Sequence, residues 1–178
     1  MKKLMFPLLL IVLGLTGCKS LSKLTQFDMD YNQSFTIPSI PTPIALPFPI
    51  QTPEIQTNSE TYFSSHNIDP DLIEKVSLKK LDLTISAPAD GDFGFLKTIE
   101  ISIAAEGQDD VKIAWLEDVP VGAGSTLSMN VSNVDLKAFI MKEKFNLKIK
   151  ASTDEATTSE YTIDAKTVFS LDANILGL

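Results

Sequence analysis

The sequence contains no arginine, one cysteine, one histidine and one tryptophan among its 178 residues. Acidic residues exceed lysines, and the formal net charge is −8. The chain therefore lacks the basic, arginine-containing face that phosphate neutralisation and base readout require, which excludes nucleic-acid binding from our expectations. A lone Cys18 cannot form an intramolecular disulfide, and a lone His66 leaves almost no ligands for a transition metal. We expect no cofactor and no metal site.

Residues 1–18 show three zones that are typical of a secretory signal. A basic start with two lysines is followed by an uncharged apolar run over residues 4–15 and by a small-residue exit at Thr16 and Gly17. The apolar run is interrupted by Pro7 and Gly14. A membrane-spanning helix needs roughly 20 consecutive apolar residues, so this run is too short to remain as an anchor.

The tetrapeptide Leu15-Thr16-Gly17-Cys18 resembles the lipobox of bacterial lipoproteins. The resemblance covers residues 1–18 only. It implies cleavage between Gly17 and Cys18, acylation of the Cys18 sulfur by chains such as palmitate, and a lipoprotein attached to a membrane by those chains. The alternative is an incidental thiol beside an ordinary cleavage site. Each buried CH₂ contributes about 0.8 kcal/mol, so two or three chains on Cys18 would hold the protein durably on a bilayer.

The residue after Cys18 bears on which membrane would hold the protein. In bacterial lipoproteins an Asp at this position often retains the protein at the inner membrane, whereas this chain has Lys19. The resemblance thus implies a cell-envelope location, at the outer membrane rather than the inner one. It does not distinguish the periplasmic face of that membrane from the cell surface. Residues 18–26 would form the lipidated N-terminus and a short polar tether, which reaches at most about 28 Å when extended.

Residues 27–178 are expected to form one domain that is large enough for a real core. Apolar and polar residues alternate with the period of two that marks strands with one buried face. A break in this alternation at Lys79 and Lys80 indicates a β-bulge. The runs predicted as strands are 27–37, 76–85, a hairpin over 98–116, 127–131, 145–151 and 161–173.

These runs predict a mainly β protein, an antiparallel β-sandwich of jelly-roll-like type with about seven or eight strands. One or two short helices are expected at connections. One would begin at Asp69, with Pro70 in its first turn, and another would cover residues 136–142.

The segment 38–53 holds six prolines interleaved with large apolar residues. Proline cannot donate to a β-ladder or occupy a helix interior, so we expect an extended, irregular segment. It is interpreted as an apolar crossover packed on one edge or end of the domain. The alternative is a polyproline II strip that docks a partner.

Candidate chemical groups are few. Ser64, Ser65, His66 and Asp69 lie close in sequence, but a catalytic triad normally draws on distant positions, so we interpret them as a loop. Asp90-Gly91-Asp92 is interpreted as a turn rather than a calcium site, because it lacks the later ligands of a calcium loop. The remaining carboxylate pairs, Asp109/Asp110 and Glu117/Asp118, have no feature that sets the separation a glycosidase needs. We therefore predict no catalytic residue and no enzyme activity.

Some apolar residues fall outside the alternation, namely Phe93, Phe95, Leu96 and Trp115. They either line an apolar groove or close an end of the sandwich. The first hypothesis for function is a membrane-anchored accessory or protein-interaction module of the cell envelope, with an envelope protein as its partner. The alternative is a lipoprotein that binds or carries a lipid or another hydrophobic ligand, and a hydrolase is the third possibility.

Overall fold

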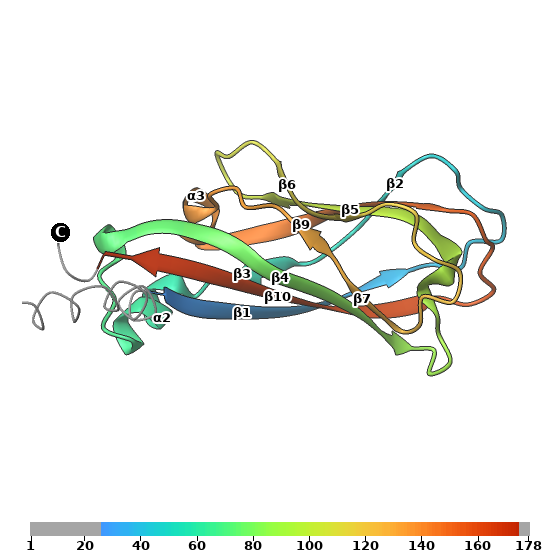
Figure 1. Cartoon of the computed structure of the whole chain (residues 1–178), viewed down its shortest axis with the longest axis horizontal. Coiled ribbons are helices and arrows are strands. Elements are labelled where there is room, and N and C mark those ends of the chain that lie inside the picture. Colours follow the sequence, from blue (N-terminus) through green and yellow to red (C-terminus); the bar gives the residue numbers. More distant parts are fainter. Residues whose placement is uncertain (1–25, 175–178) are drawn as a thin grey trace, which may run out of the picture.

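Two antiparallel sheets face each other in the computed structural model, which describes residues 26–174 (Figure 1). Sheet A has four strands in the order β1 (Gln26–Ile37), β10 (Tyr161–Ala173), β4 (Ile73–Ala87) and β7 (Thr126–Ser128). Sheet B has six strands, β2 (Phe48–Ile50), β3 (Glu54–Gln56), β9 (Lys144–Thr153), β5 (Leu96–Ala104), β6 (Val111–Leu116) and β8 (Asn130–Val131). In sheet B, β2 and β3 both pair with β9. The predicted antiparallel β-sandwich is confirmed.

The core lies between the sheets, and the two-residue period of the long strands builds it. In β1 every second residue from Met29 to Ile37 is buried, and the residues between them face solvent. At the centre, Tyr31 of β1, Phe169 of β10 and Phe145 of β9 meet edge to face, with ring centroids 5.3 to 5.9 Å apart. These rings join the two sheets.

The predicted bulge in β4 is present. Val168 of β10 lies opposite Lys80, but the next residue, Phe169, lies opposite Leu78, so Lys79 is the extra residue. The bulge returns Leu78 and Leu81, three positions apart, to the same buried face. It thereby keeps the inner face of a fifteen-residue strand apolar along its length.

The helical elements are short. Asp69 begins a single 3₁₀ turn at Pro70–Leu72, and its carboxylate accepts the Asp71 N–H at 3.0 Å. The helix expected over residues 136–142 is confined to α3 (Lys137–Ile140). A further helix, α2 (Ser59–Ser65), was not predicted, since it starts at a left-handed Asn58 without a side-chain cap. Among the described residues, no helix is long and apolar enough to cross a membrane.

The proline-rich segment is more regular than predicted. Residues 48–50 and 54–56 form β2 and β3 along the outer edge of β9, where Pro49 can be accommodated because an edge strand has a side without ladder bonds. Ahead of β2, Ile40 and Ile44 each exchange hydrogen bonds of 2.7 to 2.9 Å with Thr157 and Thr153 respectively. Ile40 and Ile50 are buried, whereas Ile44 and Leu46 are exposed.

One predicted strand is divided between the two sheets. The run 127–131 supplies β7 to sheet A, opposite residues 82–84, and then β8 to sheet B, opposite Ala114 and Trp115. Between them the Met129 N–H donates to the Leu81 carbonyl at 3.0 Å. This division, together with β2 and β3, raises the number of strands within residues 26–174 to ten, against the expected seven or eight.

Candidate binding surface

Three of the four residues predicted for an apolar groove lie in the core. Phe93, Phe95 and Leu96 are at most 4% exposed, and the Phe95 ring contacts Tyr161 with centroids 4.7 Å apart. Trp115 is half-buried and lies on the opposite, outer side of sheet B. The structure therefore does not bring the four residues together on one surface. The 3₁₀ turn Phe93–Phe95 and the first residue of β5 are buried in the core, whereas β6 directs Trp115 outward.

The neighbours of Trp115 follow from strand register. Trp115 of β6 pairs with Glu100 of β5 and with Asn130 of β8. Glu100 in turn pairs with Lys150 of β9, and Lys150 pairs with Pro49 of β2. Residues directly opposite across an antiparallel pair share a face of the sheet, so these five positions form one row across the outer face of sheet B.

A hollow of about 500 Å³ opens beside this row. We call it the Trp115 trough, and its lining includes Pro47, Thr98, Glu100, Trp115, Leu116, Glu117 and Lys150. Pro47 stands at one side and Trp115 at the other, whereas Leu116 pairs with buried Ile99 and so lies on the inner face of the sheet. The polar side chains come largely from the two strands between, β5 and β9.

Two lysines give the trough different electrostatics at its two sides. The Lys112 ammonium lies 5.2 Å from the centroid of the Trp115 ring and 3.5 Å from a carboxylate oxygen of Glu100. It therefore connects the ring on β6 to the floor of the trough, which β5 and β9 form. In contrast, the side chains of Lys150 and Glu117 make no hydrogen bond or ion pair with any other described residue. The trough therefore offers a free cationic donor and a free anionic acceptor beside an aromatic ring.

The floor is further ordered by a hydroxyl pair. Thr98 of β5 and Ser152 of β9 lie opposite each other, and their side-chain oxygens are 2.7 Å apart. Sequence reasoning found Trp115 but missed its surroundings. The pairing of Glu100 with Trp115 follows from the predicted hairpin, whereas Lys150 and Pro47 reach the site only through sheet assembly.

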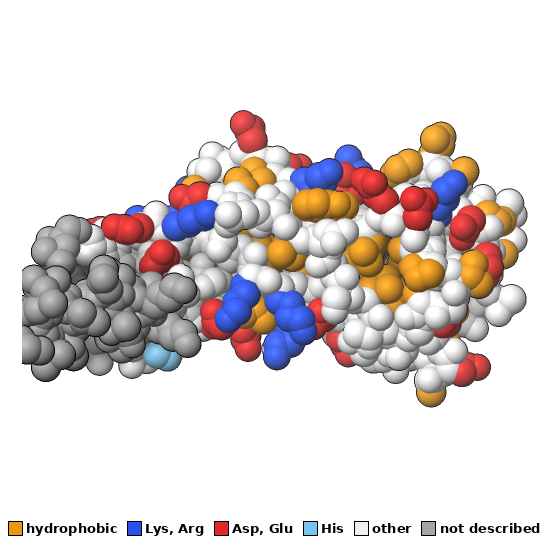
Figure 2. Space-filling model, in the orientation of Figure 1, with side chains coloured by type: hydrophobic (Ala, Val, Ile, Leu, Met, Phe, Trp, Pro, Cys, Tyr) orange, Lys and Arg blue, Asp and Glu red, His pale blue; other side chains and the backbone are white. Residues whose placement is uncertain are grey.

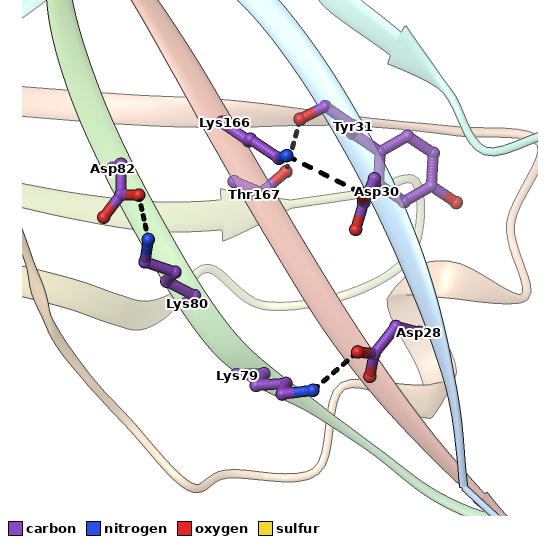
Figure 3. A network of polar contacts seen from close by, with 8 residues as sticks. All are labelled: Asp28, Asp30, Tyr31, Lys79, Lys80, Asp82, Lys166 and Thr167. Atoms are coloured by element: carbon purple, nitrogen blue, oxygen red, sulfur yellow. Dashed lines mark hydrogen bonds and ion pairs between the residues drawn. The ribbon is translucent and has the colours of Figure 1, made fainter.

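The outer face of sheet A differs from the trough because its charges neutralise one another (Figure 3). Lys79 pairs with Asp28 at 2.5 Å across β4 and β1, and Lys166 lies 3.8 Å from Asp30. Lys80 pairs with Asp82 along β4. Exposed pairs of this kind contribute little to stability, about 0–1 kcal/mol each, and they leave few free groups for a ligand.

The residues considered for catalysis are engaged locally. The Ser65 hydroxyl donates to the Tyr62 carbonyl at 2.9 Å, and His66 Nδ1 lies 2.8 Å from the same carbonyl oxygen. The His66 ring stacks on Tyr62, with centroids 4.2 Å apart. Asp69 caps its own turn, as described above. These groups form the end of α2 and the loop after it.

The acidic turn at residues 90–92 has a structural role. The two carboxylate oxygens of Asp92 accept the N–H groups of Gly94 at 2.6 Å and Gly124 at 2.7 Å. Asp92 thus joins the loop before β5 to the loop before β7. In the described part of the chain, no group of three or more histidine, cysteine, aspartate or glutamate side chains is placed to hold a metal ion.

Comparison with protein-family models and with curated protein sequences found no match to this chain. Among solved structures, a chain of Desmodium yellow mottle tymovirus is 12% identical at a TM-score of 0.30, over 85% of this chain and 90% of that one. A chain of turnip yellow mosaic virus is also 12% identical at a TM-score of 0.30, over 84% of each chain. Similarity this weak carries no inference about function.

Proposed function

We propose that this protein is a bacterial lipoprotein, anchored to the cell envelope by acyl chains on Cys18, and that it acts there as a non-enzymatic accessory or interaction module. The observation that carries the proposal is the lipobox-like Leu15-Thr16-Gly17-Cys18 behind a basic start and an apolar run. Residues 1–25, and with them the signal segment and Cys18, lie outside the described residues.

The position of β1 is compatible with such an anchor. β1 begins at Gln26, eight residues after Cys18, at the end of the sandwich that carries α2 (Figure 1). This end is identified by the Tyr62 hydroxyl of α2, which donates to the Asp28 carbonyl at 2.7 Å. With the anchor at this end, the opposite end of the sandwich would face away from the membrane.

That opposite end carries apolar side chains that solvent can reach. Leu46 is 78% exposed and Val121 81% exposed, and hydrophobic side chains gather at this end of the view in Figure 2. Exposed apolar residues that cluster indicate a contact surface more often than chance exposure does. In addition, the inner faces of the sheets are filled by large side chains such as Phe145 and Phe169, which favours a surface-binding role over carriage of a lipid inside the sandwich.

The anchor is tested by Cys18→Ser, with Ser20→Ala as the matched control. Cells are given labelled palmitate, and the envelope is then separated from the soluble fraction. We expect label and membrane association in the parent chain and in Ser20→Ala, and loss of both in Cys18→Ser. A Cys18→Ser protein that stays in the membrane fraction to the same extent would refute the anchor.

The outer-membrane assignment is tested at the next residue. We expect Lys19→Asp to move the protein from outer-membrane to inner-membrane fractions on a density gradient, because Asp at this position often causes retention in bacterial lipoproteins. The control is Lys23→Asp, which makes the same charge change four residues further on. An unchanged gradient profile for Lys19→Asp, or an equal shift for Lys23→Asp, would contradict the assignment.

The interaction role is tested with a photo-crosslinking amino acid placed at Leu46, and in the control at Lys166 on the outer face of sheet A. We expect a reproducible crosslinked adduct with an envelope protein from position 46 only. Equal adducts from both positions, or none from position 46, would count against a partner at the end opposite to the anchor.

A further inference from the structure

We propose that the Trp115 trough is a binding site for a neutral saccharide, with a pyranose ring stacked on Trp115. The inference concerns the outer face of sheet B alone and does not depend on the lipid anchor. It therefore stands or falls separately from the function proposed above.

The chemistry of a pyranose explains the match. One face of the ring consists of C–H groups, and its rim carries hydroxyls that both donate and accept hydrogen bonds. An aromatic ring attracts such C–H groups, because the face of its π-system is electron-rich. A saccharide site therefore needs an accessible aromatic ring with mixed donors and acceptors beside it. The Trp115 trough combines these features.

The strand that carries the aromatic ring is held in place. Trp115 lies on a strand paired on both sides, with β5 and with β8. The Lys112 ammonium lies 5.2 Å from the ring centroid and 3.5 Å from a carboxylate oxygen of Glu100. The backbone that carries the ring is thus fixed before a ligand binds, which lowers the entropic cost of association.

The polar groups have the composition expected for hydroxyl recognition. Lys150 can donate and Glu117 can accept, and neither side chain has a partner among the described residues. Thr98 already shares a hydrogen bond of 2.7 Å with Ser152, so its hydroxyl is oriented. A saccharide hydroxyl can donate a hydrogen bond to an acceptor or accept one from a donor, which suits a surface that presents both.

The same groups argue against other ligands. An acyl chain or an apolar peptide would remove Lys150, Glu100 and Glu117 from water without replacing their hydrogen bonds, which costs free energy. A strongly anionic ligand would meet Glu100 and Glu117, and a strongly cationic one would meet Lys112 and Lys150. A neutral ligand with many hydroxyls avoids both costs.

The size of the trough also fits. Pro47 precedes β2 and Trp115 lies on β6, and the strands β9 and β5 run between them. Three strand spacings of about 4.8 Å place the two sides of the trough roughly 14 Å apart. That span accommodates one or two pyranose rings.

The test uses the fact that Trp115 is the only tryptophan in the chain, so its fluorescence reports on this site alone. The full chain is purified in a detergent without a sugar headgroup and titrated with maltohexaose, cellohexaose, xylohexaose and mannohexaose. We expect at least one of them to shift the emission saturably. A polyproline peptide and phosphatidylglycerol vesicles are titrated in parallel.

Variants then assign the binding, which is measured for them by calorimetry. We expect Trp115→Ala to weaken it at least about tenfold, Trp115→Phe to retain part of it, and Glu117→Gln to weaken it less. Lys166→Ala, on the outer face of sheet A, should leave it unchanged. Circular dichroism of each variant controls for folding. The proposal is overturned if none of the four saccharides shifts the emission, if Trp115→Ala and Trp115→Phe both bind like the parent chain, or if only the peptide or the vesicles produce the shift.

Discussion

Gln33 is a buried polar residue whose replacement should stabilise the protein. It lies on β1 between Tyr31 and Phe35, and the alternation of the strand turns it into the core. Its side chain is 8% exposed, and neither amide atom has a hydrogen-bond partner among the described residues. Its cross-strand neighbour on β10 is Ala165, which offers no polar side-chain atom.

The substitution Gln33→Met keeps the length of the side chain and removes both polar atoms. A buried amide without a hydrogen bond costs roughly 1–3 kcal/mol, and a methionine of similar shape does not carry this cost. We therefore expect the free energy of unfolding to rise by about 1–3 kcal/mol. For a domain of this size each kcal/mol corresponds to roughly 2–4 °C, so Tm should rise by about 2–12 °C.

Urea denaturation of the chain from residue 18 onward, in a Cys18→Ser background, measures this change. The matched control is Gln51→Met, which replaces an exposed glutamine and should change the free energy by no more than about 0.5 kcal/mol. A destabilised Gln33→Met protein with an unchanged denaturant slope would refute the reasoning, because it would mean that the Gln33 amide is satisfied in solution.

Three further predictions concern the same background. Phe169→Ala should lower the free energy of unfolding by about 3–5 kcal/mol, since it empties the centre of the aromatic cluster, and a loss below about 1 kcal/mol in urea denaturation would contradict that placement. Asp92→Ala should cost about 2–3 kcal/mol by releasing two backbone N–H groups, whereas Asp90→Ala, at an exposed position, should cost less than about 0.5 kcal/mol, and equal effects would argue against the bridge between the two loops. Burial raises the pKa of Tyr31 above its ordinary value of 10.0, so the unfolded chain releases this proton first and stability should fall as pH rises above about 10. Tyr31→Phe should therefore show a shallower alkaline decline in denaturation midpoints between about pH 9 and 11.5, and an unchanged decline would exclude Tyr31 as a cause.

The long strands could be predicted from local sequence because their buried faces repeat every two residues. The run from Phe27 to Ile37 and the run from Tyr161 to Ala173 were both found in this way, and they pair along their whole length as β1 and β10. The bulge at Lys79 could also be predicted, since a change of phase within one apolar run indicates an inserted residue.

Short elements could not be predicted, because their stability comes from neighbours rather than from their own residues. The strands β2 and β3 contain three residues each and are held by β9, which lies about 90 residues later in the chain. The helix α2 has seven residues and no side-chain cap, so local propensity gives little sign of it.

The sequence by itself determined the β class of the domain and the inner faces of its long strands, and it is the source of the proposed lipid anchor at Cys18. These properties are local, because they depend on residue type and spacing within one segment. Only the tertiary structure decided that 126–131 divides between the sheets, that Gln33 is buried without a partner among the described residues, and that Pro47, Lys150 and Trp115 share a trough. Those features arise where segments far apart in the chain pair in register, and strand register across a sheet depends on the packing of both faces.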